Sequence, residues 1–196
     1  SSQKEILDLL ELIHEDISGI KIGLQYITQR SPEEIRELSK FKKPIFYDGK
    51  FFDIKNTLIE SIRSLKTLNI DYATVHLLNG FEALLAANKT AQEINIKLLG
   101  VSVLTSFNDE DLKILGFNDK LQDQVKRLIK IAKSANLHGV ICSPLEIKMI
   151  KEIEPSLKCF TPGIRMSDTK NDQKRTMSAN EAIKAGSDYL IIGRPI

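Results

Sequence analysis

DYATVHLLNGFEALLAANKTAQEINIKLLGVSVL, residues 71–104, is the stretch that decides the fold. Residues 71–76 mix aromatic, β-branched and small side chains, a pattern that predicts a strand. Residues 81–93 repeat Leu and Ala at helical spacing and predict a helix. Residues 96–104 are a run rich in Ile, Leu and Val, typical of a strand buried on both faces. A strand, a helix and a second strand in this order predict two parallel strands with the helix packed on the sheet.

The same alternation continues from this unit toward both ends of the chain. Further strands are predicted at residues 19–24, 44–50, 138–142, 157–160 and 189–193. Further helices are predicted at residues 3–16, 32–41, 54–68, 118–134, 144–153 and 179–185. Seven expected strands therefore alternate with seven expected helices, and the first element of the series is a helix.

This regular alternation predicts an α/β fold, a (β/α)₈ TIM barrel. Such a barrel needs eight strands to close, whereas this series opens with a helix and stops after a strand at GRPI (193–196). We therefore expect residues 1–196 to form a single barrel domain of a longer polypeptide, short of its first strand and last helix. An open doubly wound sheet is the alternative, although no GxGxxG follows an early strand to favour it.

The composition fits one soluble globular domain, with 196 residues of which 42% are hydrophobic and 28% charged. The net charge of +2 comes from interspersed residues, so electrostatic binding to nucleic acid is not indicated. No apolar run approaches the roughly 20 residues that span a bilayer, and the N-terminus is too polar for a signal peptide. We expect a cytoplasmic protein that does not enter a membrane. Cys142 and Cys159 have no metal-ligand spacing and are expected to be free, partly buried thiols.

The stretch FYDGKFFDIKNT (46–57) gathers Asp48, Lys50 and Asp53 at the carboxyl end of a predicted strand, where barrel enzymes carry their catalytic groups. Residues two apart on a strand share a face, so Asp48 and Lys50 are expected to point the same way. A lysine beside carboxylates stays protonated, because each negative neighbour favours its charged form. Lys50 is then a fixed cation and a proton donor. An ordinary ion pair at a strand end is the alternative.

Two further stretches near the C-terminus indicate a phosphate site. TPGIR (161–165) follows a strand and leads into a polar loop that contains Gln173. The last strand ends in Gly193 and Arg194, where backbone N–H groups and a guanidinium would hold a phosphate at the position usual for phosphate-binding barrels. A surface turn with solvated arginines is the alternative.

Taken together, these stretches resemble the orotidine 5′-phosphate decarboxylase family. DGKFFDIKNT matches a D-x-K-x-x-D-I-x-N-T signature, and the resemblance continues through VLTS (103–106), TPGIR, DQKR (172–175) and IIGRPI (191–196). The resemblance implies an enzyme without metal or cofactor that converts orotidine 5′-monophosphate to UMP and CO₂ in pyrimidine synthesis. It also implies a homodimer with shared active sites.

The resemblance also implies roles for individual residues. Lys50 would stabilise and protonate C6 of the pyrimidine, with Asp48 near the departing carboxylate and Asp53 supplied by the neighbouring subunit. The implied substrate-binding residues are Lys21, Asn56, Thr57, Thr105, Arg165, Gln173, Gly193 and Arg194. Lys21 would contact the ribose, Thr57 the partner's substrate and Thr105 the pyrimidine. Arg165, Gln173, Gly193 and Arg194 would bind the phosphate.

The sequence departs from the family pattern in two places. No residue corresponds to the ribose-binding Asp that ends the family's first strand. The usual V-H-A-x-G-G appears as VHLLNG (75–80), which keeps His76 and Gly80 but places two leucines between them. His76 is either a satisfied strand-end histidine or part of a dimer interface.

Two other functions remain open on sequence grounds. A sugar-phosphate decarboxylase or synthase of the same suprafamily would use the same Asp-Lys-Asp core with Mg²⁺, and a chelator would abolish its activity. A non-catalytic phosphate-ligand binder would bind UMP tightly without turnover.

Overall fold

The computed structural model describes residues 2–165 and 176–193, and its main feature is a seven-stranded sheet. Every neighbouring pair in this sheet is parallel. Its strands in spatial order are β1 (Ile20–Gly23), β2 (Ile45–Phe51), β3 (Tyr72–His76), β4 (Lys97–Val101), β5 (Gly139–Ile141), β6 (Lys158–Thr161) and β9 (Tyr189–Leu190). Spatial order thus follows chain order. A doubly wound sheet reverses its strand order at a switch point, so that alternative was wrong.

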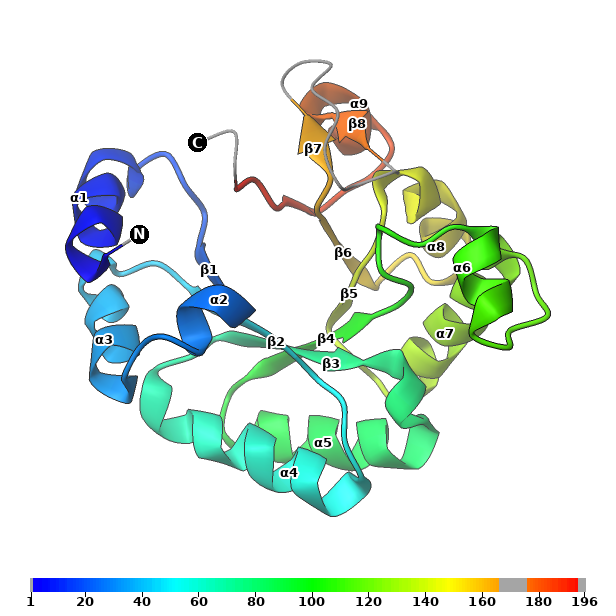
Figure 1. Cartoon of the computed structure of the whole chain (residues 1–196), viewed down its shortest axis with the longest axis horizontal. Coiled ribbons are helices and arrows are strands. Elements are labelled where there is room, and N and C mark those ends of the chain that lie inside the picture. Colours follow the sequence, from blue (N-terminus) through cyan, green and yellow to red (C-terminus); the bar gives the residue numbers. More distant parts are fainter. Residues whose placement is uncertain (1, 166–175, 194–196) are drawn as a thin grey trace.

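Helices alternate with the strands along the chain. The α-helices are α1 (Gln3–Ile13), α2 (Leu24–Ile27), α3 (Pro32–Glu37), α4 (Lys55–Ser64), α5 (Phe81–Glu93), α6 (Asp109–Ile114), α7 (Leu121–Ser134), α8 (Ile147–Ile153) and α9 (Ala179–Lys184). Of these, α3, α4, α5, α7 and α8 lie outside the curved row of strands (Figure 1). Short 3₁₀ helices are η1 (Leu38–Phe41), η2 (Leu65–Leu68), η3 (Leu77–Asn79) and η4 (Pro144–Glu146). Within residues 2–165 and 176–193, no helix has the length and apolar character needed to cross a membrane.

Contacts between aromatic rings show that the sheet curls as a barrel does. Three strands lie between β2, which carries Phe46, and β6, which carries Phe160, yet the two ring centroids lie 5.9 Å apart. Tyr72 on β3 also contacts Phe160, with centroids 5.4 Å apart. Side chains on the concave face can meet in this way only if the sheet bends around them. The predicted barrel-type α/β fold is confirmed, and these rings fill its interior below the carboxyl ends of the strands.

A second, larger core lies between the convex face of the sheet and the helices. Helix α7 shows why these segments are helical, because its apolar side chains recur on one face. The residues of α7 that this face buries are Leu121, Val125, Leu128, Ile129 and Ala132. Each large side chain of this kind stabilises the fold by roughly 1.5–3 kcal/mol when it is fully buried. This burial holds the helices against the sheet, so the loops at the strand ends are attached to a rigid framework.

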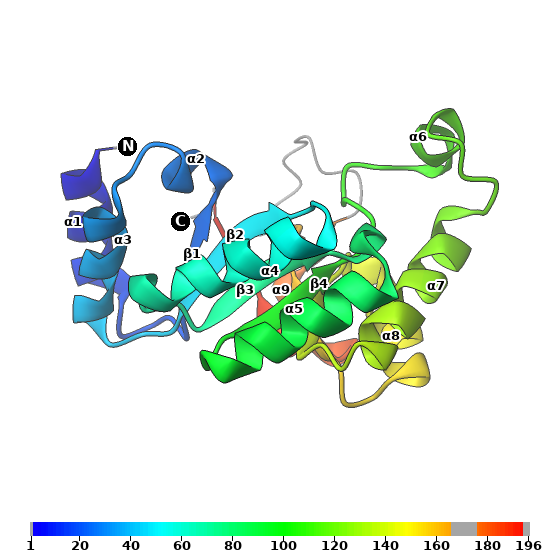
Figure 2. The ribbon, with the colours of Figure 1, turned by 90° about the horizontal axis from the view of Figure 1, so that it is seen from below.

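The structure also contains short elements that the sequence pattern did not predict. Helices α2 and α6 follow β1 and β4, and Figure 2 shows both at the same end of the molecule. Strands β7 (Ile164–Arg165) and β8 (Met177–Ser178) pair with each other as a separate two-stranded sheet. These elements have two to six residues, too few to show periodicity. The predicted strand 96–104 was also too long, because β4 ends at Val101.

Cys142 and Cys159 are both free thiols, as predicted. Both are completely buried, with exposed fractions of 1% and 0%, so the expectation of partial burial was wrong. They belong to the packed core next to β5 and on β6.

Candidate active site

Asp48 is the centre of a charged cluster at the carboxyl end of β2. Its Oδ1 accepts a hydrogen bond from Lys50 Nζ at 2.9 Å, and its Oδ2 accepts one from Lys21 Nζ at 3.3 Å. The Asp48 side chain is only 12% exposed, whereas the side chains of Lys50 and Lys21 are about one third exposed, at 32% and 33%. Each carboxylate oxygen thus holds one ammonium group, and the three side chains together carry one net positive charge.

Strand geometry explains why these residues meet. Phe46 points into the barrel interior, and Asp48 lies two residues further along the same face. Gly23, at the end of β1, is in register with Asp48, which places Lys21 of the same strand beside it. The predicted proximity of Asp48 and Lys50 is confirmed by their ion pair.

Lys50 departs from regular strand geometry, with a backbone φ of 48°. Positive φ is uncommon for a residue with a Cβ. The pairing of β2 with β3 shifts here, since Tyr47 is opposite Ala73 but Phe51 is opposite Val75. Four steps along β2 therefore match two along β3, and the end of β2 bulges. Strand alternation alone did not predict this distortion.

Gly49 is required by the aromatic pair on the other face of β2. Tyr47 and Phe51 stack with ring centroids 5.7 Å apart and ring planes within 2° of parallel. A Cβ at position 49 would lie 2.8 Å from Tyr47 Cε1. The glycine between Asp48 and Lys50 therefore leaves room for the two rings to close over the backbone.

Thr74 on β3 also belongs to the cluster, although no sequence motif pointed to it. Its Oγ1 accepts a hydrogen bond from the Lys50 backbone N–H at 2.8 Å and donates one to Asp48 Oδ1 at 3.1 Å. The residue has an exposed fraction of 0%. The sequence does contain a signal for Thr74, which is a hydroxyl group between apolar neighbours in a buried strand. A buried polar group requires hydrogen-bond partners.

Asn79 holds the segment that follows β2. Its Nδ2 donates to the carbonyl oxygens of Phe51 and His76 at 2.9 and 2.7 Å, and its Oδ1 accepts from the Asp53 N–H at 3.0 Å. The Asp53 carboxylate is exposed, and its Oδ1 accepts a hydrogen bond from the Ile54 N–H at 2.7 Å. Among the residues that the structure describes, no ion pair joins Asp53 to Lys50 of the same chain.

His76 ends β3 next to Lys50. Burial lowers the pKa of His76, and the positive charge of Lys50 lowers it further. His76 Nδ1 accepts a hydrogen bond from the Leu78 N–H at 3.3 Å, which a neutral ring with its proton on Nε2 provides. The ring also lies 5.4 Å from that of Phe52.

The two leucines of VHLLNG have different environments. Leu77 is fully buried over Gly100 of β4, where a Cβ would lie 2.5 Å from Leu77 Cδ2. The bulk of Leu77 is therefore accommodated by a glycine on the neighbouring strand. Leu78 is 41% exposed and lines an apolar cavity of 110 Å³ with His76 and Val103.

The remaining predicted site residues lie at the same end of the sheet where the structure describes them. Asn56 and Thr57 are exposed in the first turn of α4, and Thr105 is half-buried in a turn after β4. Gly193 is exposed after β9, and the backbone of Arg165 ends β7. Gln173 and Arg194 lie outside the described residues.

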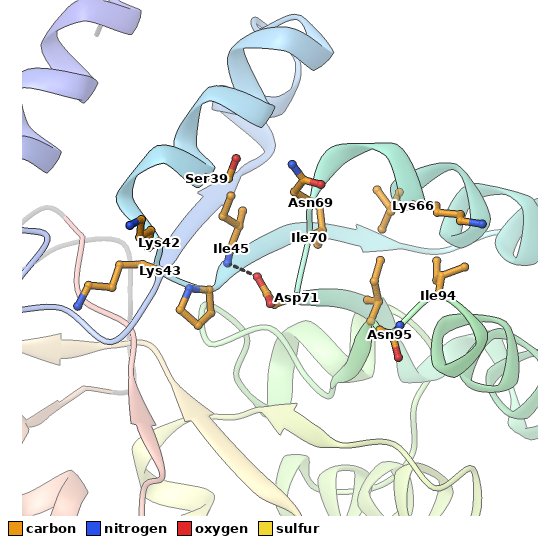
Figure 3. Close-up of a pocket in the computed structure, with 13 residues that line it drawn as sticks. Ser39, Lys42, Lys43, Ile45, Lys66, Asn69, Ile70, Asp71, Ile94 and Asn95 are labelled. Carbon is orange, nitrogen blue, oxygen red and sulfur yellow. Dashed lines mark hydrogen bonds between the residues drawn. The ribbon is translucent and has the colours of Figure 1, made fainter.

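A hollow of about 540 Å³ lies at the opposite, amino-terminal ends of the strands (Figure 3). Asp71 lines it and accepts a hydrogen bond from the Ile45 N–H at 2.8 Å. Lys42, Lys43 and Lys66 also line it. None of the predicted site residues that the structure describes lines this hollow. The charged cluster around Asp48 is therefore the candidate active site. Within residues 2–165 and 176–193, no group of three or more His, Cys, Asp or Glu side chains could hold a metal ion.

A barrel-type parallel sheet with a lysine-carboxylate cluster at the carboxyl ends of its strands defines an α/β-barrel enzyme. The chain belongs to the orotidine 5′-phosphate decarboxylase / HUMPS family, whose model matches residues 1–196. It is 41% identical over 185 residues to the orotidine 5′-phosphate decarboxylase of Wolbachia pipientis subsp. Culex pipiens, covering 94% of this chain and 82% of the relative.

Crystal structures of other proteins share the fold. The crystal structure of orotidine 5′-phosphate decarboxylase from Lactobacillus acidophilus matches with a TM-score of 0.79 and 30% identity, over 95% of this chain and 86% of that one. The crystal structure of an uncharacterized conserved protein from Geobacillus kaustophilus matches with a TM-score of 0.85 and 25% identity, over 98% of this chain and 86% of that one.

Proposed function

We propose that this chain decarboxylates orotidine 5′-monophosphate to UMP and CO₂ in pyrimidine biosynthesis. The observation that carries the proposal is the Lys50 ammonium group fixed 2.9 Å from Asp48 at the carboxyl ends of the strands. The Wolbachia relative, which bears the decarboxylase name, supports the choice of reaction.

The residue types suit this chemistry. When the bond between C6 and the carboxylate breaks, CO₂ leaves and the electron pair remains on C6 as a carbanion. A fixed cation next to C6 stabilises the transition state more than the ground state. Lys50 supplies this charge, then donates a proton from Nζ to C6 as general acid, and regains a proton from solvent.

Asp48 and Lys21 complete the charged cluster in this proposal. Asp48 lies beside the substrate carboxylate and holds Lys50 in place through Oδ1. Lys21 neutralises Oδ2 of the same carboxylate and reaches the ribose. Because both Asp48 oxygens are already bound to ammonium groups, the cluster is pre-organised before substrate arrives.

We further propose that the enzyme acts as a homodimer with shared active sites. Asp53 and Thr57 are exposed, and within the chain Asp53 has no ion pair with Lys50 among the described residues. Phe52 and Ile54 flank Asp53 with exposed fractions of 63% and 74%, and Leu78, Phe81 and Leu85 are also at least 41% exposed. Large exposed apolar side chains that lie together mark interaction sites. A second subunit would cover them and receive Asp53 beside its own Lys50.

The remaining assignments are also part of the proposal. Thr105 would contact the pyrimidine, and Asn56 the substrate near Thr57. The phosphate would be held by Arg165, Gln173, Gly193 and Arg194. Residues 1–196 would act as one catalytic domain in the cytoplasm, without metal or cofactor.

The test is the loss of pyrimidine absorbance when the purified protein meets orotidine 5′-monophosphate in the presence of a chelator. We expect rapid turnover by the wild type and, for Lys50→Ala, a loss of roughly 10²- to 10³-fold, because one well-placed electrostatic group commonly contributes that much. Lys40→Ala is the matched control, since Lys40 is 43% exposed and pairs with Glu11, which belongs to α1.

Three outcomes would contradict the proposal. Turnover that disappears with chelator would indicate the magnesium-dependent sugar-phosphate branch. Tight UMP binding without turnover would indicate a non-catalytic binder. Full activity of Lys50→Ala would remove Lys50 from the chemical step.

A further inference from the structure

We propose that Thr74 is a positioning residue that fixes both the backbone of Lys50 and the carboxylate of Asp48. This inference rests on the proposed function and deepens it. Thr74 lies on β3, whereas Asp48 and Lys50 lie on β2, so its side chain connects the two strands at the site. The hydroxyl group is 2.8 Å from Lys50 N and 3.1 Å from Asp48 Oδ1.

The chemistry of a hydroxyl group matches these two partners. A threonine hydroxyl can donate one hydrogen bond and accept others. The Lys50 N–H can only donate, and the Asp48 carboxylate can only accept, so the direction of both bonds is fixed. Thr74 has an exposed fraction of 0%, and water therefore has no access to replace the hydroxyl if it is removed.

The Lys50 backbone is the group that most needs such support. Its φ of 48° is unfavourable for a residue with a side chain, and the regular pairing of β2 with β3 is interrupted between Tyr47 and Phe51. The Thr74 Oγ1 takes the place of the missing strand-to-strand acceptor for the Lys50 N–H. Strained backbone at functional sites persists only where the surroundings hold it.

Both hydrogen bonds act on the position of the Lys50 ammonium group. One fixes where the Lys50 side chain leaves the backbone, and the other orients the Asp48 oxygen that binds Lys50 Nζ at 2.9 Å. Loss of the hydroxyl should therefore displace the ammonium group from C6 while leaving the substrate's ribose and phosphate contacts in place. We therefore expect a larger effect on kcat than on KM.

Thr74→Val tests this inference, because valine keeps the shape and removes the hydroxyl. We expect kcat to fall roughly ten- to a hundredfold while KM changes less than about threefold, as for a small misplacement of a catalytic group. Thr74→Ser restores the hydroxyl and should recover kcat to within about fivefold of wild type. Thr90→Val is the matched control, since Thr90 is also buried, with an exposed fraction of 6%, and lies on α5 and not on a strand of the site.

A crystal structure of Thr74→Val gives a readout that does not depend on turnover. We expect the Lys50 φ to leave the positive region or the distance from Lys50 Nζ to Asp48 Oδ1 to exceed the present 2.9 Å. Unchanged geometry, wild-type kcat in Thr74→Val, or equal losses in the Ser and Val variants would each overturn the inference. A wild type without turnover would overturn the proposed decarboxylation instead, and the crystal structure would still decide the role of Thr74.

Discussion

The side-chain oxygen of Asn79 accepts a hydrogen bond from the backbone N–H of Asp53 at 3.0 Å, across 26 positions of sequence. Asn79 also donates to the carbonyl oxygens of Phe51 and His76. One side chain therefore ties the segment after β2 to the end of β3. In the family pattern V-H-A-x-G-G, the residue at the position of Asn79 is a glycine, which has no side chain to form these hydrogen bonds.

We expect Asn79→Ala to reduce both stability and activity. Three lost hydrogen bonds, partly replaced by water, should lower the free energy of unfolding by about 1–3 kcal/mol. If Asp53 acts across the dimer interface, its displacement should also lower kcat by roughly tenfold. Urea denaturation and steady-state kinetics measure the two effects.

Asn88→Ala is the matched control for Asn79→Ala. Asn88 is buried on α5 and donates to the carbonyl oxygens of Ala135 and Asn136 at 3.2 and 2.8 Å. Its loss should lower stability by about the same 1–3 kcal/mol and leave kcat unchanged. An equal fall of kcat in both variants would show that Asn79 acts only through general stability.

The second prediction concerns the packing of Leu77 against Gly100. In Gly100→Ala the new methyl group would meet Leu77 Cδ2 at 2.5 Å, and Leu137 Cδ1 at 3.1 Å. Such overpacking of a core should cost about 1–3 kcal/mol of unfolding free energy. Thermal or urea unfolding of the variant measures this cost.

A double-mutant cycle then tests the origin of the cost. Leu77→Ala alone leaves a cavity and should cost about 2–5 kcal/mol. If the two residues compensate each other, the double variant should be more stable than the sum of the two single changes predicts, by about 0.5–3 kcal/mol. Strict additivity would show that the small residue at position 100 is unrelated to the bulk of Leu77.

The sequence predicted the fold because its longer elements, such as β2 (Ile45–Phe51) and α7 (Leu121–Ser134), show their periodicity. Helix α5 agrees with the predicted range 81–93 at both ends. All seven strands of the main sheet lie where strands were predicted, and six of them, β1 to β6, carry buried apolar residues between polar turns. Helix α6 is too short for such a pattern, and its sequence signal is the capping box that Asn108 and Asp111 form at its start.

The candidate site was predicted in part for a similar reason. Asp48 and Lys50 lie only two residues apart at the end of one strand, so their side chains can meet even though β2 bulges there. Thr74 and Asn79 reach the site through hydrogen bonds across 24 to 28 positions of sequence. Such partners depend on strand register and on the bulge of β2, neither of which a single sequence reveals.

The third prediction is a pH dependence that comes from His76. Burial and then the charge of Lys50 lower the pKa of His76 in the folded protein, so the unfolded chain binds a proton more readily. Stability rises with pH wherever the unfolded state binds more protons. The contribution of neutral His76 is therefore fully present above the unfolded pKa of about 6.5, and it is lost as pH falls through the lower folded value. Urea midpoints measured at intervals between pH 7.5 and about 5 report this loss.

His76→Gln separates this effect from other titrations. Glutamine can still accept the Leu78 N–H hydrogen bond through Oε1, as His76 Nδ1 does at 3.3 Å, but it cannot gain a proton in this range. Protonation of His76 would remove that acceptor. It would also place a positive charge beside the ammonium group of Lys50, and the repulsion between the two charges opposes protonation. The wild type should therefore lose more stability than His76→Gln between pH 7.5 and about 5. His138, whose pKa burial and then Lys97 and Lys158 also lower, adds the same trend to both proteins and cancels in the comparison. Parallel pH profiles for the two proteins would show that His76 titrates normally in the folded state.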